Sequence, residues 1–363
     1  MSLEFARTLD SIPVYPAAAT YAFTGDLVKL ASNETPYAPH PAVLEAIQNA
    51  ARNINRYPDP SHAVLRKRLA DRTGRPGAQI TLGNGSCEIL LAAAQAMLEP
   101  GAEIVYAWPA FSMYPQLAAM TGARAIEVPL TASQSHDLDA MASEINAATR
   151  IVLICNPNNP TATALTVQEI DDFIASLPRH VAVIIDEAYV EFQTLQDPDE
   201  SLALLDKHPN VVLLRTFSKV YGLCGLRVGY ALGPESFRSA CDRVRQPFSV
   251  NMLAQAAATE ALNHLDEIAS RVERTVVERI HLESELEDRG LATTDSQANF
   301  SWVSVGDKSE DDVMRGLGER GVIVRAGADL GGPGWMRVTY GTRAENDAFL
   351  AALDESLAQA GPA

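Results

Sequence analysis

Short apolar runs alternate with longer amphipathic stretches between about residues 60 and 245. The short runs are typical of buried strands, whereas the longer stretches repeat apolar residues at every third or fourth position, which is typical of helices. Strands that alternate with helices predict a mostly parallel sheet with helices on both faces. The predicted strands are 104–106, 124–128, 150–154, 181–185, 211–215 and 227–232, and the clearest helices are 86–98 and 166–177.

The pattern changes after Pro247. The last two strands before it, 211–215 and 227–232, are separated only by a turn, so an antiparallel pair there would make the sheet mixed. Residues 251–290 have the pattern of one long helical region with many charge pairs four positions apart, which could connect two domains. Short β-like runs follow at 299–305, 322–327 and 335–340. This order of elements predicts a second, smaller α+β domain.

Composition and charge narrow the classes of function. Hydrophobic residues make up 47% of the 363 residues, which favours a globular chain of two domains. A formal net charge of -17 and the absence of a basic run argue against nucleic acid or membrane partners. The four cysteines, none at C-x-x-C spacing, indicate free thiols in a reducing compartment. No leader pattern and no apolar run of ~18 residues is present, so we expect a cytoplasmic protein without a membrane span.

A glycine-rich turn opens the helix predicted at 86–98. The stretch TLGNGSCEILL, residues 81–91, places Ser86 at the N-cap position. The first N–H groups of a helix favour an anion. The stretch departs from G-x-G-x-x-G at Glu88, and it lacks the lysine of a P-loop. Taken alone, an ordinary capped turn is the simpler interpretation.

Polar side chains also follow two of the predicted strands. The stretch CNPNNPTAT, residues 155–163, sets asparagines between prolines in a rigid turn. Asp186 follows five apolar residues, and Tyr189 comes three residues later. A buried carboxylate needs a cationic or hydrogen-bonding partner. Ligands of open α/β sheets bind at such strand ends. No histidine cluster accompanies Asp186, so we expect no metal site, and we expect Glu187 and Glu191 to be solvated or structural.

A lysine lies between hydroxyl groups and an arginine in LRTFSKVYGLCGLRVGY, residues 214–230. An isolated lysine is usually a surface residue. A lysine such as Lys219, held near apolar walls and cations, has a lowered pKa and can act as a nucleophile. The neighbouring Ser218 hydroxyl and Arg227 guanidinium suit a phosphate group.

Together these motifs place four kinds of group at successive strand ends: an anion-binding helix start, an amide, a carboxylate with a phenol, and a lysine between hydroxyl groups and an arginine. One ligand needs all of them. Pyridoxal 5′-phosphate (PLP) needs a Schiff-base lysine for its aldehyde, a carboxylate that keeps its pyridine nitrogen protonated, and an anion site for its phosphate. The sequence therefore predicts a PLP protein.

The chain resembles the fold-type I PLP-dependent aminotransferases, and more narrowly the histidinol-phosphate aminotransferase family with its aromatic amino acid aminotransferase relatives. The resemblance implies a large PLP-binding domain at 36–247 with a mostly parallel, mixed sheet between helices. It also implies a smaller α+β domain at 248–363 and an N-terminal segment, 1–35, that packs near the active site. The matching motifs are LVKLASNETPY (27–37), NRYPDP (55–60), GNGSCEIL (83–90), CNPNNPT (155–161), IDEAYVEF (185–192), RTFSKVYGLCGLRVGY (215–230), QANF (297–300) and MRVTYGTRAENDAFL (336–350).

The resemblance implies a role for each motif residue. Lys219 would form the Schiff base and then move the proton from the substrate. Asp186 would pair with the pyridinium nitrogen, and Tyr189 and Asn159 would contact the ring oxygen O3′. Phe111 would stack on the ring. The cofactor phosphate would be held by Gly85, Ser86, Cys87, Thr216, Ser218 and Arg227.

The resemblance also implies a substrate site. Arg337 would bind the anionic end of the substrate with help from Asn33, and Arg325 and Tyr15 are candidates for a substrate phosphate. The N-terminal stretch VYPAAATYAF lacks the Pro-Gly that usually follows the family's tyrosine, so Tyr21 is a rival of Tyr15.

Three further positions bear on assembly and on departures from the family. Tyr57 would reach the cofactor phosphate in the neighbouring subunit's site, which implies a homodimer with shared active sites. Ala162 stands where glycine usually follows Pro-Thr, and we expect a negative φ there. Cys224 replaces a small residue and has no assigned role.

The implied reaction is ping-pong transamination in histidine biosynthesis, from histidinol phosphate and 2-oxoglutarate to imidazole-acetol phosphate and glutamate. An aromatic amino acid aminotransferase is the nearest alternative, because Arg337 can hold a phosphate or a carboxylate. A PLP-dependent decarboxylase of a phosphorylated amino acid and a non-catalytic PLP-fold binding protein are less favoured alternatives.

Overall fold

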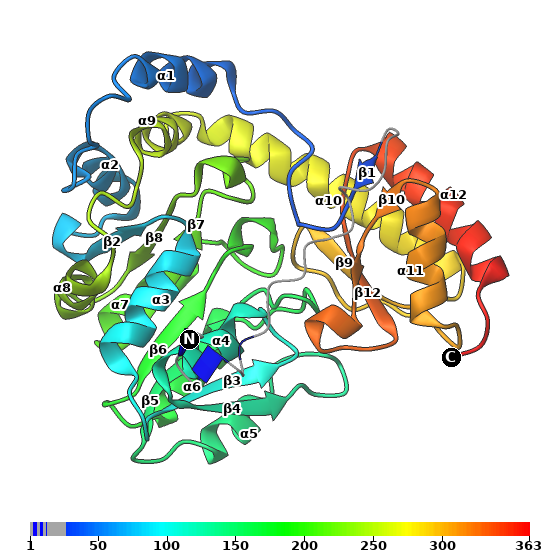
Figure 1. The fold of residues 1–363 in the computed structure, drawn as a ribbon, viewed down its shortest axis with the longest axis horizontal. Helices are drawn as coiled ribbons and strands as arrows, with labels where there is room; N and C mark the ends of the chain where they lie inside the picture. Colours follow the sequence, from blue (N-terminus) through cyan, green and yellow to red (C-terminus); the bar gives the residue numbers. More distant parts are fainter. Residues whose placement is uncertain (1–2, 6–7, 10–11, 13–26) are drawn as a thin grey trace.

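The computed structural model describes residues 3–5, 8–9, 12 and 27–363 (Figure 1). A seven-stranded sheet in the order β2-β8-β7-β6-β5-β3-β4 forms its larger part. From β7 to β4, neighbouring strands in this order pair in parallel, whereas β8 is antiparallel to both of its neighbours. The sheet is therefore mixed, as the sequence predicted. Its strands are β2 (Ile80–Gly83), β3 (Glu103–Trp108), β4 (Arg124–Pro129), β5 (Thr149–Cys155), β6 (Ala182–Asp186), β7 (Val211–Thr216) and β8 (Gly229–Leu232).

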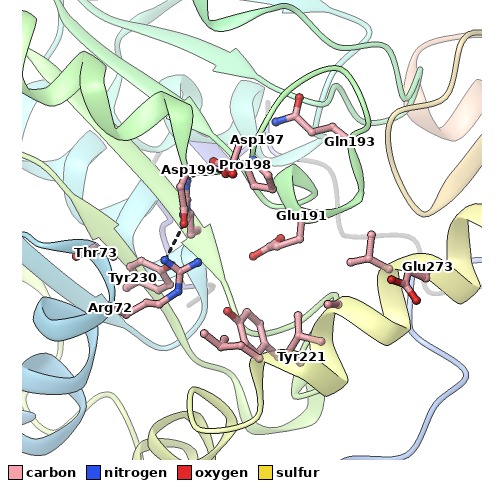
Figure 2. Close-up of a pocket in the computed structure, with 15 residues that line it drawn as sticks. Arg72, Thr73, Glu191, Gln193, Asp197, Pro198, Asp199, Tyr221, Tyr230 and Glu273 are labelled. Atoms are coloured by element: carbon pink, nitrogen blue, oxygen red, sulfur yellow. Dashed lines mark hydrogen bonds and ion pairs between the residues drawn. The ribbon is translucent and has the colours of Figure 1, made fainter.

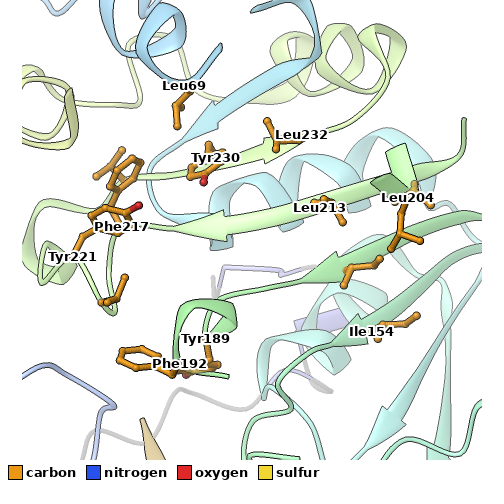
Figure 3. Packing of buried hydrophobic residues seen from close by; sticks show 14 of the residues in the cluster. Leu69, Ile154, Tyr189, Phe192, Leu204, Leu213, Phe217, Tyr221, Tyr230 and Leu232 are labelled. Carbon is orange, nitrogen blue, oxygen red and sulfur yellow. The ribbon is translucent and has the colours of Figure 1, made fainter. Parts of the chain in front are cut away.

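Helices cover both faces of this sheet because alternate strand residues point to opposite sides. In β3, Ile104 and Tyr106 belong to one core, whereas Val105 and Ala107 belong to the other. The first core is closed by α3 (Ser86–Met97), α4 (Met113–Thr121) and α8 (Glu235–Val244). The second core, part of which Figure 3 shows, is closed by α1 (Pro41–Ala51), α2 (Ala63–Thr73), α5 (Leu138–Ser143), α6 (Val167–Ser176), α7 (Leu204–Lys207) and α9 (Met252–Ala261).

The helical region at 251–290 is two helices rather than one. Helix α9 ends at Ala261, and α10 (Leu265–Asp288) begins four residues later. Asn263 interrupts the helix because its side chain bonds elsewhere, donating to Glu260 and accepting from Arg68. Asp266 then lies in the first turn of α10, where a negative charge is favourable. Figure 1 shows α10 running from the large sheet to the smaller sheets.

The C-terminal third and the N-terminal strand β1 together form two small sheets and a third hydrophobic core. The predicted run 322–327 is divided between them: β10 pairs with the N-terminal β1, and β11 pairs with β12. The elements are β1 (Val28–Lys29), β9 (Phe300–Ser304), β10 (Val322–Ile323), β11 (Arg325–Ala326), β12 (Trp335–Thr339), α11 (Glu310–Glu319) and α12 (Arg343–Gln359). The domain limits at 35 and 247 stay a prediction. Among the described helices, none is both long and apolar enough to cross a membrane.

Candidate active site

A cavity of about 250 Å³ lies at the carboxyl ends of β5, β6 and β7. This edge is where ligands of such sheets bind, because the loops that follow parallel strands meet there. Motifs that lie far apart in the sequence converge on it. The predicted residues that line it are Ser86, Cys87, Phe111, Asn159, Asp186, Tyr189, Thr216, Ser218, Lys219 and Arg227.

The start of α3 forms one wall of this cavity. Its N-cap is Gly85 rather than Ser86, and in the described chain no side chain caps the helix. Gly85 has φ 76°, and a Cβ there would lie 2.5 Å from Arg227 Nη2. On the other side, a Cβ at Gly229 would lie 2.5 Å from the Ser86 nitrogen. The two glycines therefore let a guanidinium and β8 approach the first N–H groups of the helix, which suits an anion.

Hydroxyl groups from the end of β7 complete this anion site. Thr216 Oγ1 donates to Ser218 Oγ at 3.0 Å, and the Ser218 N–H donates to Thr216 Oγ1 at 3.1 Å. Arg227 donates to Ser218 Oγ at 3.4 Å and to the Cys224 carbonyl at 3.0 Å. A helix start, hydroxyls and a guanidinium around one space are the donors that bind a phosphate.

Asp186 lies at the end of β6 and is only 3% exposed. Its carboxylate accepts a hydrogen bond from the Tyr114 hydroxyl at 3.1 Å and from the Ala188 N–H at 3.3 Å. Burial raises the pKa of Asp186 to about 6 despite these bonds. The sequence interpretation missed Tyr114. The available signal was its position three residues after Phe111, in the first turn of the helix that follows.

Lys219 is partly buried against the same cavity. Its Nζ donates to the Ser32 carbonyl at 3.0 Å and lies 5.5 Å from the centroid of the Tyr189 ring. Burial, and then the positive charge of Arg337, lower the pKa of Lys219 to about 8. An amine with this pKa exchanges protons readily near neutral pH.

Arg337 and Asn33 hold residues that line the cavity. Arg337 donates to Asn159 Oδ1 at 2.6 Å and to the Ala31 carbonyl at 2.6 Å. Asn33 donates through Nδ2 to the Tyr189 hydroxyl at 2.9 Å. Burial raises the pKa of Tyr189, so its phenol stays protonated. This network joins the small sheet at β12 to the edge of the large sheet.

The remaining predicted residues lie apart from the cavity. Tyr57 is 80% exposed and stacks on Phe248 with ring centroids 4.6 Å apart. Arg325 is buried opposite Arg337 on the paired strands β11 and β12. Tyr15 and Tyr21 fall outside the described residues.

The expectation of a negative φ at Ala162 is wrong. Ala162 has φ 61°, the left-handed conformation that glycine adopts freely. The turn requires it, because the Ala162 N–H donates to the Asn158 carbonyl while the Asn158 N–H donates to the Thr163 carbonyl, both at 2.8 Å. The expectation for Glu187 is consistent with the structure: it is buried and accepts from Arg215 Nε at 2.7 Å.

Fold and cavity together define a PLP-dependent aminotransferase. The chain matches the family described as aminotransferase class I and II over residues 25–353 and belongs to that family. Its cofactor is PLP, and the glycine-bounded anion site and the strand-end carboxylate fit this group.

Several relatives cover almost the whole chain. An aromatic amino acid aminotransferase from Thermobifida fusca is 43% identical over 345 residues, 94% of each chain. A histidinol-phosphate aminotransferase from Akkermansia muciniphila is 43% identical over 332 residues, 92% of this chain and 90% of the relative. The solved structure of histidinol-phosphate aminotransferase from Sinorhizobium meliloti in complex with PLP has a TM-score of 0.90 at 27% identity, covering 99% of this chain and 98% of that one.

Proposed function

We propose that this chain transfers the amino group of histidinol phosphate to 2-oxoglutarate. The observation that carries the proposal is a pair of buried arginines. Arg325 and Arg337 lie directly opposite each other on the antiparallel strands β11 and β12, so their side chains leave the same face. Asp329 Oδ2 lies 3.8 Å from Arg325 Nε, and a bound anion would further stabilise two like charges that lie opposite each other. A phosphate carries two negative charges, whereas the carboxylate of an aromatic amino acid carries one.

Different residues of the cavity would bind different parts of the cofactor. Ser86 and Cys87 with Ser218, Thr216 and Arg227 would hold its phosphate, and Gly85 leaves room for the Arg227 guanidinium. Asp186 would bind the ring nitrogen. Other lining residues would orient the ring: Phe111 over its face, and Asn159 and Tyr189 at its oxygen O3′. When bound, PLP supplies the electron sink that makes the substrate Cα–H acidic.

Lys219 would move the proton in this reaction. Its Nζ would accept the proton from the substrate Cα as general base and pass it to the cofactor's C4′, and the second half of the reaction would run these transfers in reverse. The lowered pKa, about 8, lets the amine release and take protons near neutral pH. Arg337, fixed by Asn159 and the Ala31 carbonyl, would hold the anionic end of the substrate so that its Cα faces Lys219.

A second candidate donor is an aromatic amino acid. Relatives named aromatic amino acid aminotransferase match this chain at 40–43% identity, among them those of Thermobifida fusca and Streptomyces coelicolor. Arg337 alone would suffice for such a donor, because a single guanidinium holds a carboxylate by two hydrogen bonds.

The two candidates are separated by kcat/KM for histidinol phosphate and for phenylalanine, each with 2-oxoglutarate as acceptor. We expect a higher value for histidinol phosphate. Arg325→Gln should lower that value about tenfold or more and should change the value for phenylalanine far less, because a charged hydrogen bond to the phosphate is lost. Arg315→Gln, a change of the same charge at an exposed arginine of α11, is the control. A higher kcat/KM for phenylalanine in the parent protein would favour the second candidate.

A further inference from the structure

A second cavity, of about 480 Å³, lies away from the active-site cavity (Figure 2). It is bounded by the end of α2, the segment 191–199, strands β7 and β8, and the first turns of α10. The two cavities have no lining residue in common. Arg215 on β7 lines the second cavity, whereas Thr216, the next residue, lines the active-site cavity. The mechanism above makes no use of this space.

Two buried side chains that line this second cavity, Tyr221 and Gln193, each have a polar atom without a hydrogen-bond partner in the described chain, and a carboxylate beside them has no ion pair. Tyr221 is 8% exposed, and its hydroxyl makes no hydrogen bond there; Figure 2 shows it directed between Arg72 and Glu191. Gln193 is 6% exposed, and its Oε1 has no partner. The Glu191 carboxylate makes no ion pair within the described part of the chain, and its hydrogen-bond partner there is its own backbone N–H. Buried polar groups without partners are rare and indicate that another molecule supplies them.

The charge around this space is negative. Its two arginines are already paired: Arg72 with Asp199 at 2.7 Å, and Arg215 with Asp199 at 2.8 Å and with Glu187 at 2.7 Å. The carboxylates of Glu191, Asp197 and Glu273 also line the cavity, and no described cation lies within ion-pair distance of them. Burial raises the pKa of Glu191 to about 7, against the attraction of Arg215. A cation beside Glu191 would therefore stabilise its ionised form.

The opposite walls are apolar or aromatic. The first turns of α10 contribute Leu265, Ile268, Ala269 and Val272, and the rings of Tyr221 and Tyr230 also line the cavity. Apolar side chains and aromatic faces bury the hydrocarbon part of a ligand, and aromatic rings also attract a cation. An anion would meet the free carboxylates and is excluded by the same geometry.

We propose that this cavity is a binding site for a small organic cation with an aromatic or aliphatic body. The cationic N–H groups donate to the Glu191 carboxylate, and the Tyr221 hydroxyl and Gln193 amide complete the polar contacts. The hydrocarbon body packs between the tyrosine rings and α10. The ligand class follows from carboxylates without a cationic partner that lie in the same cavity as apolar and aromatic walls, because a cation makes charge-assisted hydrogen bonds to the former and buries its body against the latter.

The test uses the PLP-loaded protein and benzamidine, a flat aromatic cation that presents N–H groups to a carboxylate. Titration calorimetry at pH 8 is expected to show one benzamidine bound per chain. Benzamide, which has nearly the same shape and no charge, should bind at least about tenfold more weakly. Glu191→Gln should weaken benzamidine binding by about tenfold or more and leave the weak binding of benzamide unchanged.

Asp288→Asn is the matched control, because it removes one carboxylate from the exposed end of α10, outside the cavity. It should change benzamidine affinity by less than about twofold, since exposed charges are screened. Thermal melting shows whether Glu191→Gln is folded. Three results would overturn the proposal: no binding to the parent, equal binding to the folded Glu191→Gln variant, or competition of benzamidine with the amino donor, which would place it in the active-site cavity.

Discussion

The active-site cavity contains two ionisable side chains whose charged forms are costly. Burial raises the pKa of Asp186 to about 6 and lowers that of Lys219 to about 8. Both shifts go toward the neutral form, as desolvation requires. In our proposal neither group has a described ion-pair partner until cofactor and substrate bind, so the free protein carries an electrostatic cost in exchange for its chemistry.

The electrostatic cost of burying the Asp186 carboxylate can be measured as a change in the free energy of unfolding. Its pKa of about 6 in the folded chain lies above the ordinary value of 3.8. The folded chain therefore retains a proton that the unfolded chain releases between pH 4 and 6, and this contribution to stability is lost as the pH rises through that window. Without cofactor, Asp186→Asn should be about 1–3 kcal/mol more stable than the parent at pH 8, with a smaller gain below pH 5.

Urea unfolding of the cofactor-free proteins at both pH values measures this gain. Asp288→Asn, an exposed carboxylate on α10, should change the free energy of unfolding by less than about 0.5 kcal/mol at either pH. The same Asp186→Asn variant should lose transamination activity, since the amide carries no charge for the ring nitrogen. A parent more stable than Asp186→Asn at pH 8 would contradict the buried-charge argument.

Ala162 shows a second local cost. Its φ of 61° lies in a region that side chains with a branched Cβ avoid, and the residue is fully buried. Ala162→Val should lower the free energy of unfolding by about 2–4 kcal/mol through backbone strain and overpacking. Ala162→Gly should stay within about 1 kcal/mol, because relief of strain offsets the lost methyl packing. Chemical denaturation of both variants checks this, and a Val variant as stable as the Gly variant would refute the strain.

At the scale of elements, the strands and helices with regular apolar periodicity could be predicted from the sequence. Strand β2 could not, because its four residues run directly into the glycine-rich turn. The break before α10 depends on Asn263 finding partners in α2 and α9, and the split of 322–327 depends on β1 arriving from the other end of the chain. Such contacts are tertiary, and no local pattern contains them.

The same distinction applies to the active-site cavity. Residues inside motifs at strand ends could be predicted, since topology brings strand ends together. Tyr114 and Ser32 could not be assigned roles, because their contacts with Asp186 and Lys219 depend on how α4 and the segment after β1 pack on the sheet. Arg337 was identified only through a resemblance, although its bonds to Asn159 and Ala31 now show how it reaches the cavity.

Helix α10 also fixes the loop that carries Lys219. Arg271 on α10 is 2% exposed and donates to the carbonyls of Ala38 at 2.7 Å, Tyr221 at 3.2 Å and Val220 at 3.4 Å. Arg271→Met keeps the hydrocarbon length and removes every donor. The free energy of unfolding should fall by about 2–4 kcal/mol, because buried carbonyls lose their partners.

The catalytic consequence separates this role from simple destabilisation. In conditions where Arg271→Met is fully folded, kcat should fall about tenfold because Lys219 is displaced. Arg274→Met, one turn further along the same helix and 44% exposed, should cost less than about 1.5 kcal/mol and leave kcat unchanged. If both variants keep the parental kcat, α10 does not position Lys219.

At the scale of the whole molecule, Tyr57 raises the question of assembly. It is 80% exposed in a single chain and lies outside the cavity lining, yet it belongs to a motif that resembles one whose tyrosine reaches a neighbouring subunit's cofactor. A large aromatic ring stacked on Phe248 at the surface is the kind of residue that a partner covers. We propose a twofold homodimer in which each Tyr57 completes the other chain's active site.

Subunit complementation tests this assembly. Lys219→Ala and Tyr57→Ala chains should each be poorly active alone. In a mixed dimer both defects fall in one site, and the other site is intact. Random reassortment after co-expression should therefore restore about a quarter of the parental activity. Lys219→Ala mixed with Asp186→Asn is the matched control. Each chain then has a defect in its own active site, so both sites of every mixed dimer are inactive. Size-exclusion chromatography verifies that each mixture forms dimers. If activity is restored in the mixture with Tyr57→Ala and not in the mixture with Asp186→Asn, Tyr57 must act across the interface. Equal failure of both mixtures would show that Tyr57 serves no neighbouring site.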